Sequence, residues 1–178
     1  MRTTHSIFLA VSTLIVGIGL GAQGAKTTTY ADGTYGFKID LPPNTQPIAK
    51  DSQALIAQFL STPKDGFATN INIFVERAAT TRDAYIANKK KEIATMGGKL
   101  VGEKPRTVNG WDAVELDWTA PLQGNTMHWL ALAVILKEES YLVMSTSLER
   151  NYAANEKALR ASLQTFAVDT PNPAPAGK

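Results

Sequence analysis

Residues 111–148 have the sequence WDAVELDWTAPLQGNTMHWLALAVILKEESYLVMSTSL. This stretch predicts three consecutive antiparallel strands, and the middle strand contains MHWLALAVIL at residues 127–136. The run carries no Asp, Glu, Lys or Arg, but it is too short for a membrane-spanning helix, which needs about 20 apolar residues. Apolar and polar residues do not alternate in it. A strand of this composition needs cover on both faces, so the rest of the chain must supply two covering layers.

The flanking segments alternate between apolar and polar residues, which is typical of strands with one buried face. Asn109-Gly110 is the strongest two-residue hairpin signal, and Asp32-Gly33 predicts an earlier hairpin because glycine accepts a positive φ. Residues 44–51 are expected to form a loop. The strands are expected near residues 26–30, 35–41, 53–60, 70–76, 99–108, 111–119, 127–136 and 141–148.

Two helices are expected, over residues 80–96 and 150–165. Thr80 followed by Asp83 suggests a capping-box start for the first, and Gly97-Gly98 is a stop signal at its end. The fold class predicted is α+β, with an antiparallel sheet of about 6–8 strands flanked by two long helices. Because the helices lie far apart in the sequence, each one can cover a different face of the sheet.

The two ends of the chain differ in composition from the middle. Residues 1–24 combine an early charge, an apolar run and small residues, which indicates a secretory signal peptide cleaved near Gly24-Ala25. An uncleaved membrane anchor is the alternative, and only that segment would then contact a membrane. Residues 25–168 are expected to form a single domain, and the Pro-rich residues 169–178 a disordered tail. The sequence therefore predicts a periplasmic or secreted protein.

The bulk composition excludes several classes of function. The chain has 178 residues, 18 basic and 16 acidic side chains and a net charge of +2, which is not the clustered basic surface of a nucleic-acid-binding protein. It contains no cysteine. No phosphate-binding glycine loop and no dinucleotide fingerprint occurs, and neither Ser145 nor Ser147 lies in the turn motif of a serine hydrolase. We expect no cofactor.

His128 is the only histidine after the signal segment, and therefore the one candidate general base or metal ligand. No second His or Cys is present to share a metal, so a hydrogen-bonded structural role is favoured over catalysis. Asp112, Glu115 and Asp117 cluster on one strand. By parity Glu115 and Asp117 share a face, which we expect to be solvated, because two carboxylates on one strand are too few for a cation site.

Three residues are candidates for contact with a partner. Trp111 follows the tight turn and is the tryptophan most expected to be exposed, and exposed tryptophans are enriched at binding hot spots. Lys89 and Lys90 belong to a run of three lysines on the first helix, which suits an acidic partner or acidic lipids. A solvated helix face is the alternative for the lysines.

Four short motifs together resemble the PsbP-like superfamily, in particular its DcrB-type bacterial branch. They are YGFKIDLP at residues 35–42, Gly97-Gly98, the Asn109-Gly110 hairpin, and Leu-x-x-x-Leu-x-Thr-Phe-x-Val at residues 159–168. The resemblance spans roughly Tyr30 to Val168. It implies an antiparallel sheet sandwiched by helices, and a role exercised through other proteins, as in photosystem subunits, adaptors and secretion chaperones. Relatives often carry an aromatic residue after the first proline segment, where this chain has Asn44-Thr45-Gln46.

The leading hypothesis is an exported, non-enzymatic domain that binds another protein of the cell envelope. The second is a binder of a small or lipidic molecule in a cleft between sheet and helix, which a preformed cavity would support. The third and weakest is a hydrolase-type enzyme that uses His128 with a nearby carboxylate.

Overall fold

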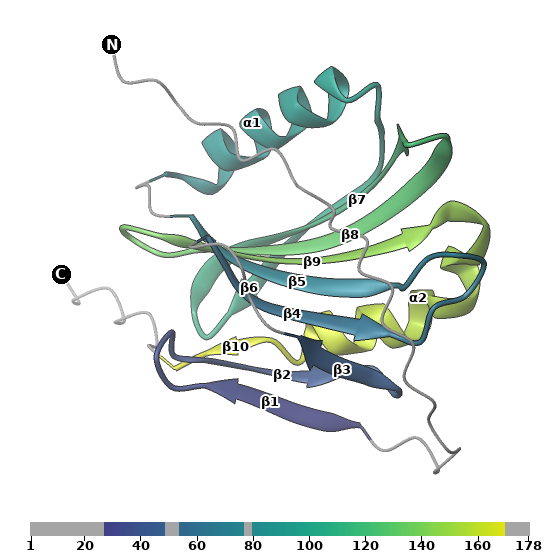
Figure 1. Cartoon of the computed structure of the whole chain (residues 1–178). Helices are drawn as coiled ribbons and strands as arrows, with labels where there is room; N and C mark the ends of the chain where they lie inside the picture. Colours follow the sequence, from purple (N-terminus) through teal and green to yellow (C-terminus); the bar gives the residue numbers. More distant parts are fainter. Residues whose placement is uncertain (1–26, 49–53, 77–79, 170–178) are drawn as a thin grey trace, which may run out of the picture.

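The computed structural model describes residues 27–48, 54–76 and 80–169 (Figure 1). The predicted signal segment and nearly all of the predicted tail lie outside these residues. The elements in chain order are β1 (Thr28–Asp32), β2 (Phe37–Leu41), β3 (Thr45–Ile48), β4 (Leu55–Ser61), β5 (Asn70–Glu76), α1 (Arg82–Thr95), β6 (Lys99–Val108), β7 (Trp111–Leu122), β8 (Asn125–Ile135), β9 (Ser140–Leu148), α2 (Glu149–Gln164) and β10 (Ala167–Val168).

The larger sheet is antiparallel throughout and has the order β3-β4-β5-β9-β8-β7-β6. The apolar run quoted above falls in β8, which pairs with β7 on one side and β9 on the other. The hairpin at Asn109-Gly110 is confirmed, since both residues have positive φ, 50° and 81°, and Val108 pairs with Trp111. The prediction of an antiparallel sheet with two helices is therefore confirmed.

A second, three-stranded sheet has the order β1-β2-β10. The sequence predicted the hairpin of β1 and β2 but not its separation from the main sheet. The turn also differs from the prediction, because Gly36 takes the positive φ of 61° in place of Gly33. Two short strands were missed. Residues 45–48, expected as loop, form β3 at the edge of the large sheet, where Pro47 is tolerated.

The large sheet is covered on both faces, as the composition of β8 requires. In Figure 1, α1 lies above the sheet, and α2 and the small sheet lie below it. Ile86 and Ile93 of α1 belong to the same apolar cluster as Leu116 and Trp129 of the sheet. The opposite face packs against the small sheet and against α2 through a second cluster, which includes Phe37, Leu130, Val143, Leu159 and Phe166.

The ends of α1 are fixed by local hydrogen bonds. Its N-cap is Thr81, one residue later than predicted, and the Thr81 side chain accepts a hydrogen bond from the backbone of Ala84 at 3.2 Å. At the C-terminal end the amides of Gly97 and Gly98 donate to the carbonyls of Ala94 and Ile93, which is a Schellman motif. In the part of the chain that the structure describes, neither helix is long and apolar enough to cross a membrane.

Candidate functional site

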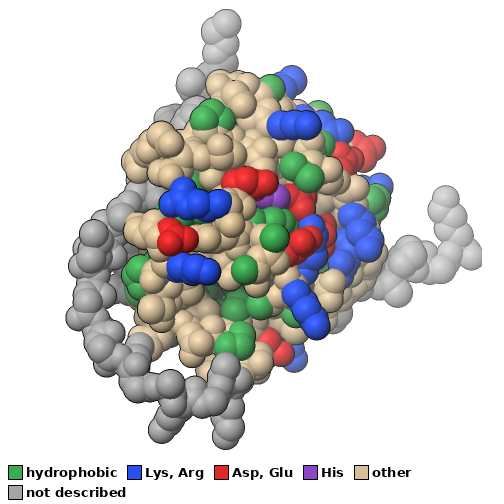
Figure 2. Space-filling view, turned by 90° about the vertical axis from the view of Figure 1, so that its right-hand side faces the viewer, with side chains coloured by type: hydrophobic (Ala, Val, Ile, Leu, Met, Phe, Trp, Pro, Cys, Tyr) green, Lys and Arg blue, Asp and Glu red, His purple; other side chains and the backbone are tan. Residues whose placement is uncertain are grey.

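A charged cluster lies between α2 and the face of the large sheet that α2 covers. We define the charged cluster as Glu115, Asp117, His128, Glu149, Tyr152 and Arg160. His128 is at its centre and only 5% exposed. Its Nε2 lies 2.5 Å from Oδ1 of Asp117, and its Nδ1 lies 2.5 Å from Oε2 of Glu149. Figure 2 shows the histidine in a band of acidic and basic side chains.

Three elements bring these side chains together. Thr119 of β7 is the direct partner of His128 in β8, so Asp117 lies diagonally across the strand pair on the same face. Glu149 is the first residue of α2, which follows β9 without a loop. Tyr152 lies one turn further along α2, and its ring stacks on the imidazole of His128 with centroids 3.3 Å apart.

Arg160 connects the same helix to the two carboxylates of β7. Its guanidinium donates to Oε1 of Glu115 and to Oδ2 of Asp117, each at 2.5 Å, and to Glu156 at 2.8 Å. Arg106 of β6 adds a longer contact of 3.4 Å to Glu115. Arg160 therefore gives a cationic partner to Glu115, Asp117 and Glu156. The fourth carboxylate, Glu149, contacts His128.

The cluster shifts the pKa values of its members. Burial alone would lower the pKa of His128, but the hydrogen bonds and charges of Asp117 and Glu149 outweigh burial and raise it. Burial alone would raise the pKa of Asp117, but its contacts with His128 and Arg160 outweigh burial and lower it. Burial and the charge of Asp117 raise the pKa of Tyr152. His128 is thus favoured as an imidazolium between two carboxylates.

The expectation of a solvated face for Glu115 and Asp117 is wrong. The two carboxylates do share a face, but α2 covers that face and leaves them 8% and 6% exposed. Burial is tolerated because His128 and Arg160 supply opposite charges at hydrogen-bond distance. Asp112, of opposite parity, contacts Arg82 of α1 on the other side of the sheet.

The cluster offers little for acid–base catalysis. A general base needs a nitrogen lone pair, and an imidazolium with both N–H groups bound to carboxylates has none to offer. His128 is hydrogen-bonded, as predicted, and its purely structural role stays a prediction. In the described ranges, no group of three or more His, Cys, Asp or Glu side chains is placed to hold a metal ion. Ser145 donates to the carbonyl of Leu130, within the sheet, at 3.0 Å.

The three residues predicted to contact a partner lie apart from this cluster. Trp111 is only 7% exposed, so the expectation that it is exposed is wrong; it packs in the core on the α2 side of the sheet. Lys89 pairs with Glu76 at 3.0 Å, as well as with Glu92. Lys90 pairs with Glu103 of β6 at 2.8 Å. The contact of these residues with a partner stays a prediction.

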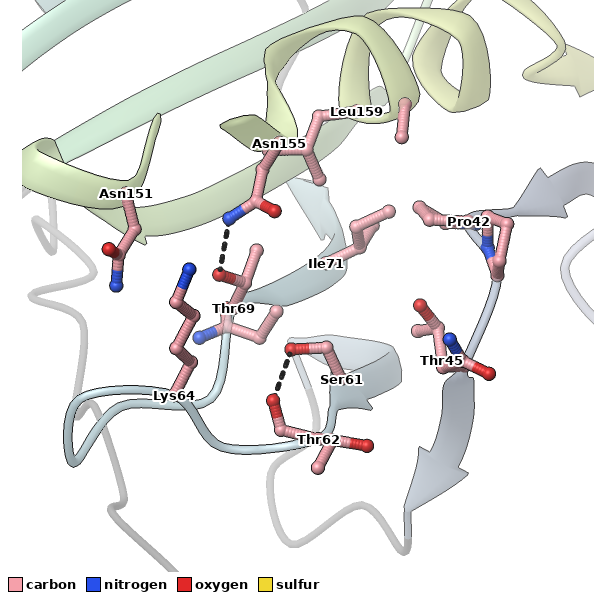
Figure 3. A pocket seen from close by; sticks show the side chains of 14 residues that line it. Pro42, Thr45, Ser61, Thr62, Lys64, Thr69, Ile71, Asn151, Asn155 and Leu159 are labelled. Carbon is pink, nitrogen blue, oxygen red and sulfur yellow. Dashed lines mark hydrogen bonds between the residues drawn. The ribbon is translucent and has the colours of Figure 1, made fainter. Parts of the chain in front are cut away.

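The other flank of α2 borders a cleft of about 360 Å³, shown in Figure 3. The cleft lies among the segment after β2, the end of β4, the start of β5 and residues 151–159 of α2. Its lining residues are Pro42, Pro43, Asn44, Thr45, Ser61, Thr62, Lys64, Thr69, Asn70, Ile71, Asn151, Asn155, Ala158 and Leu159. No local sequence pattern indicates this cleft, because four separate segments build it.

Comparison with known proteins finds similarity in structure. No protein-family model matches this sequence, and no curated protein matches it. The cyanobacterial PsbP protein CyanoP from Synechocystis sp. PCC 6803 has 16% sequence identity and a TM-score of 0.61, over 85% of this chain and 98% of CyanoP. LpqN, which is involved in cell envelope biogenesis of Mycobacterium tuberculosis, has 12% identity and a TM-score of 0.63, over 82% of this chain and 92% of LpqN.

These two likenesses concern the fold alone, because both identities are low. Assignment to the DcrB-type branch stays a prediction from the sequence motifs. The element order, the two-sided cover of the sheet and the similarity to CyanoP together show that this chain has a PsbP-like α+β fold.

Proposed function

We propose that this protein is an exported, non-enzymatic binding domain of the cell envelope, periplasmic or secreted, and of the DcrB type. The observation that carries the proposal is the state of His128. The one histidine of the predicted mature chain has both ring nitrogens bound to carboxylates, 2.5 Å away on each side. A side chain held in this way fastens α2 to the sheet and is not available as a base.

Two further observations support an envelope location. Residues 1–24 have the pattern of a signal peptide, and LpqN, which shares the fold, is involved in cell envelope biogenesis. The proposed partner is another envelope protein, in keeping with the superfamily that the sequence motifs resemble.

The surface proposed for this partner is the outer edge of the large sheet at β6. Val101 is 58% exposed and is the one large hydrophobic side chain classed as exposed among the described residues. It lies where the register of β6 against β7 shifts, between Leu100 and Gly102. Lys90 of α1 reaches the same edge through Glu103, and Lys89 lies on the same helix. An apolar contact beside paired charges suits a protein interface with a polar rim.

The test is capture of the tagged protein after mild crosslinking in cells, read by mass spectrometry. The proposal predicts one reproducible, stoichiometric envelope protein, with recovery strongly reduced by Val101→Asp or Lys90→Glu. Lys157→Glu, at an exposed position of α2, is the matched control and should leave recovery unchanged. Recovery of the tagged chain alone would contradict the proposal. Equal loss in all three variants would place the contact elsewhere and contradict the proposed surface.

A second candidate function is binding of a small molecule in the cleft beside α2. Its volume of about 360 Å³ lies within the range of small-molecule sites. The hypothesis of a small-molecule or lipid binder requires a preformed cleft between sheet and helix. The cleft between α2 and the ends of β4 and β5 supports that hypothesis.

A further inference from the structure

We propose that the cleft beside α2 binds a small amphiphilic anion, with one carboxylate or phosphate group on a short apolar body. The inference rests on the second candidate function and assigns its ligand class. It is independent of the protein interface at β6, which lies at the opposite edge of the large sheet from β3 and β4.

The inner part of the cleft is apolar. Ile71 of β5 and Leu159 of α2 border it and are 1% and 3% exposed, so they form its floor. Ala158, a small residue, is also part of the lining, and Pro42 lies across the cleft from Asn155, as Figure 3 shows. A short hydrocarbon placed here would remove apolar surface from water, which favours binding in proportion to the area buried.

The outer part carries a single charge. Lys64 is the one charged residue of the lining, which contains no Asp or Glu. The Lys64 side chain is exposed and makes no ion pair in the part of the chain that the structure describes. In Figure 3 its ammonium group points toward Asn151 and Asn155. A cation that makes no ion pair and faces a lining without carboxylates favours an anionic ligand over a cationic one.

Neutral donors accompany this lysine. The amide of Asn155 is already engaged, because it donates to Oγ1 of Thr69 at 3.3 Å and to Oγ of Ser147 at 3.5 Å. Asn151 points toward Lys64 and has no side-chain hydrogen bond to another described residue. An ammonium group and a free amide can together donate to the oxygens of one carboxylate or phosphate group. The donors lie at the mouth and the apolar residues on the floor, which predicts an amphiphile with its head outward.

Helical spacing separates this cleft from the charged cluster. Asn151, Asn155 and Leu159 follow at intervals of four residues on one flank of α2. Tyr152 and Arg160 lie on the neighbouring flank, where the carboxylates already have partners. An added anion is therefore favoured at Lys64, where the positive charge is unpaired.

The test is titration of the ¹⁵N-labelled mature protein with octanoate, octyl phosphate and octanol, followed by NMR. We expect octanoate or octyl phosphate to shift the signals of Asn151, Asn155 and Ile71 in a saturable way, with octanol at least tenfold weaker. The stronger of the two anions identifies the headgroup. Binding of neither anion, or equal affinity for octanol, would overturn the inference. Neither result would bear on the crosslinking test of the interface at β6.

Matched variants locate the site. Lys64→Gln should weaken the binding of the anion by about tenfold, in line with the loss of a charged hydrogen bond. Lys104→Gln, at an exposed position of the far edge strand β6, should leave it unchanged. Ala158→Phe fills the cleft and should abolish binding while the spectrum stays folded. Equal effects of Lys64→Gln and Lys104→Gln, or full binding by Ala158→Phe, would contradict the assignment.

Discussion

His128 and Asp117 form a buried ion pair across strands β8 and β7, with Nε2 and Oδ1 2.5 Å apart. Both residues are less than a tenth exposed. Glu149 binds the other ring nitrogen, and Arg160 binds the other oxygen of Asp117. The pair is therefore one link in a chain of alternating charges that joins α2 to the sheet. Removal of Arg160 or Glu149 leaves the buried group beside it with one oppositely charged partner fewer, which is costly.

The stability of the protein should depend on the protonation of His128. Its pKa is raised in the folded state, so the stabilisation is complete below the ordinary value of about 6.5 and is lost as the pH rises through the raised value. The pKa of Asp117 is lowered, so its contribution is complete above about 3.9 and is lost as the pH falls through the lowered value. Urea unfolding measured from pH 5 to pH 9 tests the first dependence.

The control for this dependence is His128→Gln, which cannot titrate. We expect the wild type to lose stability above about pH 6.5, and the variant to be less stable at pH 6 and nearly flat from there to pH 9. A wild-type protein that gains stability over this range would contradict the arrangement of charges described here.

Arg160→Met should destabilise the protein by about 2 kcal/mol. Methionine keeps the apolar stem but leaves Glu115 and Asp117 with one cationic partner fewer. The expected cost is below that of a fully buried pair because the Arg160 side chain is 30% exposed. Chemical denaturation at pH 7 measures it. Lys157→Met, three residues earlier on the same helix and exposed, should change stability by less than about 0.5 kcal/mol. Equal effects of the two substitutions would be inconsistent with this role for Arg160.

Gly98→Ala should destabilise the protein by about 1–3 kcal/mol. A Cβ at this position would lie 2.9 Å from the carbonyl oxygens of both Ile93 and Thr119, so either the helix end or β7 must move. Gly102 is the matched control, because its added Cβ would meet only the Cβ of Asp117, at 3.5 Å. Thermal unfolding should therefore rank Gly98→Ala well below Gly102→Ala. The reverse order would argue against this packing of α1 on the sheet.

Tyr141→Phe should cost about 1 kcal/mol, the usual worth of a hydrogen bond. The hydroxyl of Tyr141 in β9 donates to the backbone carbonyl of Tyr35 at 2.5 Å and so joins the large sheet to the turn of the small one. Burial, together with the charge of Glu139, raises the pKa of Tyr141 to about 12. The phenol therefore stays protonated and able to donate at neutral pH. Tyr30→Phe removes only a 3.4 Å contact to Asp32 and should cost less. A spectrophotometric titration checks the pKa.

The features that the sequence predicted correctly depend on residues close together in the chain. Asn109-Gly110 defines its hairpin through two positive φ angles, and Gly97-Gly98 ends α1 through bonds to residues three and five positions earlier. The apolar run in β8 correctly required cover on both faces. The short strand β10 was missed because it becomes a strand through pairing with β2, which lies far away in the sequence.

The charged cluster was missed for the same reason. Parity placed Glu115 and Asp117 on one face of β7, but parity does not say what covers that face. The covering residue, Arg160, comes 43 positions after Asp117. The apolar composition of β8 requires cover on both faces. A helix that covers one face of β8 also covers the same face of its neighbour β7. Charged residues on a strand face covered in this way are expected to be buried and paired.

The most direct test of the account is the pKa of His128 in the folded protein, measured by NMR of the imidazole ring across pH. The chain has two histidines, and the other, His5, lies in the predicted signal segment, so the mature protein gives a single histidine signal. The contacts of His128 with Asp117 and Glu149 predict a pKa above the ordinary value of about 6.5, with both ring nitrogens protonated at pH 6. A pKa at or below that value would mean that His128 keeps a free lone pair, and would contradict its structural role.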